Sequence, residues 1–336
     1  SNLRKDHPLF AQRIRQAARH GCQVIALDSV ERDWAIPVKH LLKHAASQWM
    51  QALGGIAAAV AQEKGVAGPA GSFVIDDAAT AVARSLMAGE RKAVLLGNAA
   101  AHHAQATQLL ALANWIGEHT GATVGYLTEA ANTVGAQFVG AHPVKGGLNA
   151  AQMLSGGLKA VLLLNNEPVH DSSAGARATD ALSGAEMVVT LSPFKANMEF
   201  SDVLLPIAPF TETSGSFINA EGRLQSFHAV VRPLGDTRPA WKVLRVLANM
   251  LEIPGFDFET SQDVLVRATN AAPGAFSRID AAQLSNAVTG GVTASVSGAA
   301  GEPVVASIYQ LDGLVRRSPS LQLTADARMA REEVAA

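Results

Sequence analysis

The chain has 336 residues, of which 48% are hydrophobic and 17% charged, and this composition excludes a disordered chain. Lys and Arg number 27 and Asp and Glu 29, so the net charge of -2 leaves no basic surface for nucleic acid or an anionic membrane. The single cysteine, Cys22, excludes an internal disulfide and any cluster or zinc site that needs several cysteines, and it favours a reducing compartment.

Short apolar runs alternate with amphipathic stretches along the chain, which is typical of a parallel, Rossmann-like α/β sheet. The predicted strands are bounded by Gly, Asn, Asp or Pro and cover Cys22–Leu27, Ser72–Ile75, Ala93–Leu96, Thr123–Leu127, Ala160–Leu164, Met187–Leu191 and Val203–Ile207. The predicted helices cover Pro8–His20, Pro37–Glu63, Asp77–Ala88, Ala104–His119, Ala174–Ser183 and Pro239–Leu251. Pro37 and Pro239 fit the first turn of a helix, and Gly21 and Gly121 fit its end.

The order of these elements predicts three parts. A right-handed βαβ unit needs a strand before its helix, so we expect that the sequence is cut from a longer polypeptide just after a strand. Residues 1–70 then form a partial α/β domain with a linker, residues 71–255 a second α/β domain, and residues 256–336 a C-terminal extension.

The C-terminal extension is expected to be largely irregular. Residues 287–301 are small and polar and predict a flexible linker. Pro303–Leu314 predicts one more strand, and Ala325–Ala336 a frayed or disordered helix. The longest uncharged Ala-rich stretch, Ala52–Ala61, is too short and too Gly-rich to span a bilayer, so any membrane contact is expected through a partner.

Familiar catalytic and metal motifs are missing from the sequence, so we predict neither a catalytic residue nor a metal ligand. No phosphate loop, dinucleotide fingerprint, zinc-protease motif or nucleophile elbow occurs. His102 and His103 are expected at the surface, and His40 and His44 on the solvated face of a helix. Gly54-Gly55 indicates close packing within a helix.

Two polar stretches are candidates for binding. Asn165-Asn-Glu-Pro168 follows a predicted strand and precedes Asp171-Ser-Ser173, which opens a helix; such positions bind ligands in parallel sheets, but they also cap and turn the chain. The stretch 211–225 is rich in hydrogen-bonding groups, and the same composition serves an ordinary surface loop.

Several pieces, in order, resemble one family. They are Asn2-Leu-Arg-Lys-Asp-His-Pro8, Gly21 to Asp28, Asn165 to Pro168, Phe200 to Pro206, Glu212 to Gly215, Asn219 to Arg223 and Arg238-Pro-Ala-Trp241. Together they are similar to the molybdopterin oxidoreductases, which include formate dehydrogenases and nitrate reductases, over about residues 2–255.

Within that superfamily, the chain resembles the large iron–sulfur subunit of bacterial NADH:quinone oxidoreductase (respiratory complex I). The pointers are Ser1 to Phe10, Phe194 to Asn197, Tyr309 to Ser318 and Leu321 to Thr324. The resemblance implies a C-terminal domain that has lost its molybdopterin, with 2Fe-2S and 4Fe-4S clusters upstream of residue 1. It also implies other peripheral-arm subunits as partners, no nucleic acid, and a peripheral place on the cytoplasmic side of the inner membrane.

The resemblance also implies a relict pterin groove. Active relatives contact pterin phosphate and guanine groups at positions matching Asn166, Glu167, Asp202, Glu212, Gly215, Asn219 and Arg223. Retention of these residues can be structural, with Glu212 pairing Arg223 and Asn219 turning the backbone, while Cys22 is expected in the core. Two alternatives remain open: an active molybdopterin-dependent oxidoreductase similar to formate dehydrogenase, and a module that binds a nucleotide or small molecule.

Overall fold

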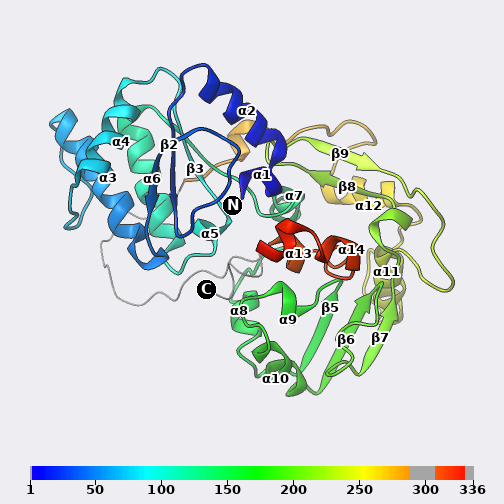
Figure 1. The fold of residues 1–336 in the computed structure, drawn as a ribbon. Coiled ribbons are helices and arrows are strands. Elements are labelled where there is room, and N and C mark those ends of the chain that lie inside the picture. The colour runs from blue at the N-terminus through cyan, green and yellow to red at the C-terminus, as the bar shows by residue number, and fades with distance from the viewer. Residues whose placement is uncertain (1, 288–306, 330–336) are drawn as a thin grey trace. The chain divides into compact units, whose positions relative to one another are not determined.

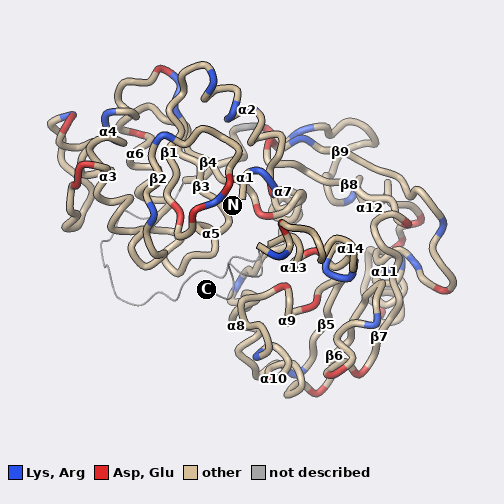
Figure 2. The backbone as a smooth tube through the Cα atoms, in the orientation of Figure 1, with Lys and Arg blue, Asp and Glu red and all other residues tan. Residues whose placement is uncertain are grey.

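A computed structural model describes residues 2–287 and 307–329 (Figure 1). The chain forms two compact units. Unit 1 comprises Ser1–Glu129, Leu284–Ile308 and Ala325–Ala336, and unit 2 comprises Ala130–Gln283 and Tyr309–Thr324. The boundary predicted near residue 70 falls inside unit 1, because helices on either side of it pack into one apolar core. Figure 2 shows acidic and basic residues interspersed along both units.

Unit 1 contains two parallel two-stranded sheets. Its strands are β1 (Val24–Asp28) paired with β2 (Val38–Lys43), and β3 (Ala93–Leu96) paired with β4 (Thr123–Tyr126). Its helices are α1 (Leu3–Asp6), α2 (Pro8–Arg19), α3 (Trp49–Lys64), α4 (Asp77–Ala88), α5 (Asn98–Ala101) and α6 (Ala106–Thr120), with a 3-10 turn, η1, at Ala46–Gln48.

Helices pack on both faces of these strands. Ile25 and Leu27 of β1 join the core made by α3, α4 and α6, whereas the alternate residue Val24 packs against α2. Because successive side chains of a strand point to opposite faces, α2 lies on one face and the other three helices on the other. This is the two-faced helix coverage of a Rossmann-like domain, as the sequence predicts.

Unit 2 is built on a three-stranded parallel sheet in the order β5 (Ala160–Leu164), β6 (Met187–Ser192) and β7 (Val203–Pro206). An antiparallel hairpin of β8 (Gly215–Ile218) and β9 (Leu224–Phe227) follows. The helices are α7 (Thr133–Phe138), α8 (Ala150–Met153), α9 (Pro168–Asp171), α10 (Arg177–Ser183), α11 (Ala240–Met250), α12 (Ser261–Thr269), α13 (Ile308–Leu311) and α14 (Pro319–Gln322), with 3-10 turns η2 (Phe210–Glu212) and η3 (Ala281–Gln283). The first residue of α13, Ile308, is counted with unit 1, and the rest of the helix belongs to unit 2.

The helix predicted over Pro37–Glu63 is wrong in its first half. Residues 38–43 form β2 and pair with β1, and α3 begins only at Trp49. Pro37 therefore precedes a strand, and His40 and His44 do not share a helix face. In so short a run, the apolar positions do not distinguish the period of a helix from that of a strand. Pairing with β1 therefore determines that the segment is a strand.

The predicted strand Ser72–Ile75 is also wrong. The segment joins no sheet; instead the Phe73 ring lies against Gly54, and the Val74 carbonyl lies against Gly55. Any Cβ on either glycine would collide with these groups, which confirms the prediction of close packing at Gly54-Gly55. A short apolar run can therefore pack against a helix without pairing with another strand.

The predictions for the tail fall partly outside the described residues. This applies to most of the linker 287–301, to 303–306 and to 330–336. Residues 308–311, predicted as strand, form helix α13, and residues 325–329 are helical. No helix in the described parts of the chain is both long and apolar enough to cross a bilayer.

Candidate functional site

The carboxyl edge of the unit 2 sheet carries the first predicted site residues. β5 ends at Leu164, and Asn165 adopts a left-handed conformation with φ of 49°, which asparagine tolerates better than most residues. The Asn165 N–H donates to the Leu191 carbonyl at 2.8 Å, and Asn197 Nδ2 donates to the Asn166 carbonyl at 2.9 Å. The turn that follows β5 is thus fixed to the neighbouring strand and loop.

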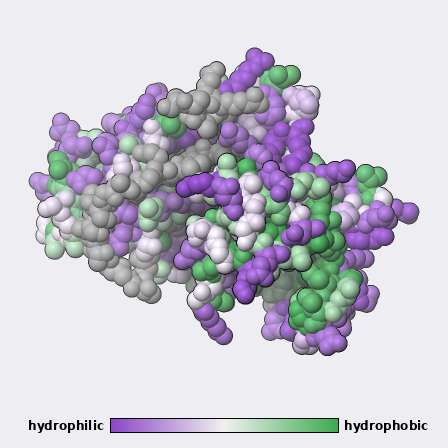
Figure 3. Space-filling model, turned by 90° about the horizontal axis from the view of Figure 1, so that it is seen from below, coloured by the Kyte–Doolittle hydropathy of each residue, from purple (hydrophilic) through white to green (hydrophobic). Residues whose placement is uncertain are grey.

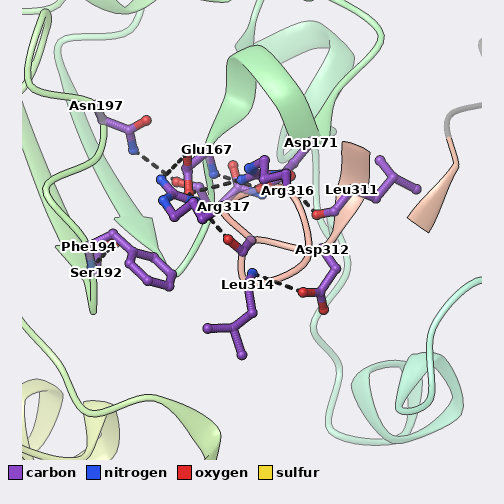
Figure 4. Close-up of polar contacts among 12 residues, drawn as sticks. Glu167, Asp171, Ser192, Phe194, Asn197, Leu311, Asp312, Leu314, Arg316 and Arg317 are labelled. Carbon is purple, nitrogen blue, oxygen red and sulfur yellow. Dashed lines mark hydrogen bonds and ion pairs between the residues drawn. The ribbon is translucent and has the colours of Figure 1, made fainter. Parts of the chain in front are cut away.

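Glu167 precedes α9 and lies at the centre of an ionic cluster (Figure 4). Its Oε1 accepts from Arg316 at 2.9 Å and from Arg317 at 2.8 Å, and its Oε2 accepts from Arg317 at 2.8 Å. Arg316 also contacts Asp171 Oδ1 at 3.1 Å, while Asp171 Oδ2 accepts from the Glu167 N–H at 2.7 Å. Two carboxylates and two guanidinium groups therefore balance each other through charge-assisted bonds. We call these four residues the Glu167 cluster.

Hydrogen bonds to nearby residues of its own segment fix the position of the Arg316 side chain. Its Nη1 donates to the carbonyls of Gln310 at 2.8 Å and Leu311 at 3.0 Å. Asp312 Oδ1 accepts from the N–H groups of Leu314 and Val315, which closes the turn between α13 and the arginines. The guanidinium is thereby aimed at the acidic pair.

Arg317 is held by an aromatic ring. Its guanidinium carbon lies 4.2 Å from the centre of the Phe194 ring, and its Nη1 donates to the Gly313 carbonyl at 3.0 Å. Stacking on the ring and a two-point contact with a carboxylate suit the planar guanidinium and not a lysine. The segment of residues 309–324 therefore makes both ionic and aromatic contacts with the edge of the sheet.

The Glu167 cluster is largely withdrawn from solvent. The Glu167 side chain is 13% exposed and that of Arg316 12%. Burial on its own would raise the pKa of Glu167, but hydrogen bonds from Arg317 and Arg316 and their positive charges outweigh it and hold that pKa below its ordinary value. Glu167 is thus an ionised structural carboxylate and not a group poised to exchange protons.

Asp202 lies at the opposite edge of the same sheet. Its Oδ2 accepts from the Val188 N–H at 2.7 Å, and its own N–H donates to the Val188 carbonyl. Val188 is near the start of β6, whereas Asn165 bonds Leu191 near its end, so the two positions are about 10 Å apart along the strand. Asp202 ties β7 to β6 and does not approach Glu167.

The remaining predicted residues belong to the hairpin of β8 and β9 and its approach. Glu212 accepts from the Leu234 N–H at 2.9 Å, and the Phe227 ring fills the space where a Cβ on Gly215 would lie. Asn219 Oδ1 accepts from the N–H groups of Glu221 and Arg223, both at 3.0 Å, which confirms its predicted role in turning the backbone. The contact found for Glu212 is this amide and not the predicted pairing with Arg223.

Histidines in unit 1 differ from the predictions. His103 is buried, not on the surface: its ring stacks on Trp49, and its Nε2 lies 3.0 Å from the Ala46 carbonyl. His102 is half-exposed, and its Nε2 lies 2.7 Å from Glu129 Oε2. This contact raises the pKa of His102 above its ordinary value, against the opposing effect of burial. The described residues contain no group of three or more His, Cys, Asp or Glu suited to a metal ion.

Cys22 is exposed and free, which corrects the prediction that it lies in the core. It sits two residues before β1, beside a cavity that separates β1 from β3. A small side chain at this point would be buried only if something filled that cavity.

Sequence reasoning named Glu167 but missed its partners. Arg316 lies 145 residues from Asp171, and Arg317 lies 150 residues from Glu167. The two adjacent arginines were the only available signal in the sequence, since nothing local indicates which carboxylate they reach.

Comparison with known proteins identifies the family that the chain matches. The family model described as Molybdopterin oxidoreductase matches residues 1–250. The chain is 37% identical over 75 residues to "Probable oxidoreductase YjgC" of Bacillus subtilis, and the match covers 22% of this chain and 8% of that protein. It is 42% identical over 59 residues to a "Putative formate dehydrogenase" in Staphylococcus aureus strains bovine RF122 / ET3-1 and USA300, covering 18% of this chain and 6% of each relative.

Proposed function

This chain belongs to the molybdopterin oxidoreductase family, and we propose on that premise that it is a structural domain without its own cofactor. The larger assembly would be a bacterial NADH:quinone oxidoreductase, with this chain part of its large iron–sulfur subunit. In that assembly electrons pass from NADH to a quinone, coupled to proton translocation, through 2Fe-2S and 4Fe-4S clusters held elsewhere.

The Glu167 cluster is the observation that carries this proposal. A pterin nucleotide would need free acceptors at the carboxyl edge of the sheet, yet both oxygens of Glu167 accept bonds from Arg316 and Arg317 of the same unit. Displacing these arginines would leave Glu167 and Asp171 as unpaired, mostly buried charges, which is costly.

The other groove residues do not fit a pterin either. Asp202 is committed to the opposite edge of the sheet, and Gly215 is packed under the Phe227 ring. The side-chain oxygen of Asn219 already accepts backbone hydrogen bonds within the hairpin turn. These contacts support the proposal that the predicted groove residues are retained for the fold and do not converge on a bound cofactor. The stretch Tyr309 to Ser318, which resembles the large iron–sulfur subunit of the NADH:quinone enzyme, is the one that supplies both arginines.

Partner subunits are the second part of the proposal. One face of the unit 2 sheet exposes apolar side chains along β5 and at the amino ends of β6 and β7, namely Leu162, Leu164, Met187 and Val203. Figure 3 shows apolar residues gathered on the side of unit 2 where β6 and β7 lie in Figure 1. Exposed apolar patches mark interaction sites, so we assign this face to neighbouring subunits of the peripheral arm, on the cytoplasmic side of the membrane.

Isolation from native cells tests the proposal. The protein should co-fractionate with NADH-dependent quinone reduction, and the fractions should not reduce a viologen dye with formate. Formate-dependent dye reduction that follows this chain, without NADH:quinone activity, would overturn the proposal.

That outcome would favour the second candidate, an active molybdopterin-dependent oxidoreductase similar to formate dehydrogenase. The printed names of the Bacillus and Staphylococcus relatives are the observation on its side. In that case the arginines of the Glu167 cluster would have to move aside when the cofactor is inserted.

A further inference from the structure

The two sheets of unit 1 face each other across a cavity. β1 pairs with β2 and β3 with β4, and within the described residues neither β1 nor β3 has a partner strand on its other edge. The cavity between them has a volume of about 1170 Å³, and every residue of β1 and of β3 lines it. Packed protein interiors contain few voids larger than a water molecule, so a space of this size calls for an occupant.

The cavity passes through the full thickness of the sheet layer. Ile14 and Ala17 of α2 line it from one face, and Leu53, Val82 and Leu109 of α3, α4 and α6 line it from the other. An occupant must therefore present apolar side chains to both faces at once. A buried strand of a parallel sheet does this, because its successive side chains point to opposite faces.

Chain direction identifies the edge that this strand would take. β3 connects through α6 to β4, moving away from β1, and α2 lies on the face opposite to α6. Since crossovers between parallel strands are right-handed, a crossover through α2 into β1 must come from the side of β1 that faces β3. The other side of β1 is taken by β2.

The start of α1 lies at the carboxyl end of this cavity. Leu3 lines the cavity and belongs to the same apolar cluster as Leu127, the residue after β4, whose N–H donates to the carbonyl of Leu96 at the end of β3. A strand that runs parallel to β1 and β3 would leave the cavity at this end, directly at Asn2.

We infer that this cavity is a slot for one more parallel strand, supplied by an extended apolar segment whose carboxyl end joins the chain at Asn2. The completed sheet has the order β2, β1, new strand, β3, β4, with the new strand at the centre. This is the doubly wound order in which the first strand of a domain lies between its second and fourth. It also explains why Cys22 is exposed, because the neighbour that would cover it is the missing strand.

Cys22 provides a direct test, because it is the only cysteine of the chain. We would extend the 336-residue chain before Ser1 with seven alternating valines and leucines and place one cysteine at either the first or the last added position. A parallel strand beside β1 puts the first position next to Cys22 at about 4.8 Å and the last about 20 Å away. Mild oxidation should then form a disulfide only in the first variant.

Equal cross-linking in the two variants, or none in either, would overturn the inference. Hydrogen exchange gives a second readout that does not need the disulfide. Against a control extension with proline at its two central positions, the apolar extension should slow exchange of the β1 and β3 amides about tenfold.

Unchanged exchange in both strands would contradict the slot.

Discussion

Arg316 and Arg317 set the chemistry of Glu167. With both carboxylate oxygens bonded to guanidinium groups and the side chain mostly buried, the residue has little capacity to bind a ligand or to transfer a proton. The same contacts tie residues 309–324 to the edge of the β5–β6–β7 sheet. Loss of either arginine should therefore lower the free energy of unfolding of unit 2.

Removing Arg316 tests this directly. Arg316→Ala leaves Glu167 and Asp171 without their shared cation, and we expect the free energy of unfolding to fall by about 3 kcal/mol, as for other broken buried pairs. Denaturant unfolding with a unit 2 fluorophore measures it. Glu259→Ala is the matched control, since it removes the exposed partner of Arg245 and should cost less than about 1 kcal/mol. Equal losses in the two variants would contradict a special role for the cluster.

Acid should weaken unit 2 through Glu167. Its pKa is lower in the folded chain than the ordinary value of 4.5, so its ionised form contributes stability above that pH, and the contribution is lost as pH falls through the lowered value. Glu167→Gln should flatten the fall of unfolding free energy with acid below pH 4.5. Glu186→Gln, at an exposed site, should leave the slope unchanged. An unaltered slope in Glu167→Gln would refute the ionic role.

At the scale of elements, α3 depends on two glycines to approach its neighbours. A Cβ on Gly55 would lie 2.5 Å from the Val74 carbonyl oxygen, and one on Gly54 would enter the Phe73 ring. Glycine weakens a helix interior by about 1 kcal/mol relative to alanine, so its presence here reflects packing and not helix propensity.

Gly55→Ala should therefore destabilise unit 1 despite the gain in helix propensity. We expect a loss of about 2 kcal/mol, because backbone next to α4 must move. Thermal unfolding followed by circular dichroism checks it. Gly184→Ala is the control, since a Cβ there meets only ordinary contacts at 3.7 Å. If Gly55→Ala is as stable as the unmodified chain, the close approach of α3 is not needed.

Local signals predicted the elements that carry their own start and stop residues. α4 begins after Asp76, whose side chain accepts from the Ala79 N–H, and α6 ends at the left-handed Gly121, both readable from sequence. β2 was missed because pairing with β1 decided it, and β8 and β9 because a polar loop and a short exposed hairpin share a composition. The Glu167 cluster could not be predicted, because its partners meet only after folding.

At the scale of the whole molecule, each unit presents an unfinished surface. Unit 1 has open strand edges at the cavity, and unit 2 exposes apolar side chains on its sheet. Such surfaces suit a domain that is completed by more polypeptide and by neighbouring subunits. In isolation we expect them to drive self-association.

Leu162→Lys with Leu164→Lys should reduce that self-association. Both side chains are exposed on β5, so charge there should cost little stability while it repels a second copy. Sedimentation velocity at increasing concentration would follow the loss of dimers and larger species. Val230→Lys, at an exposed position in the segment after β9, is the control and should leave association unchanged. A chain that is monomeric at high concentration before any substitution would contradict the expectation.

The central claim, a family member that keeps the fold without the cofactor, is tested most directly by elemental analysis. Protein isolated from its native cells would be assayed for molybdenum and tungsten, and the denatured sample for pterin fluorescence. The account predicts neither metal nor pterin in proportion to this chain. One metal atom with its pterin for each chain would contradict the account and would make the carboxyl edge of the β5–β6–β7 sheet a working cofactor site.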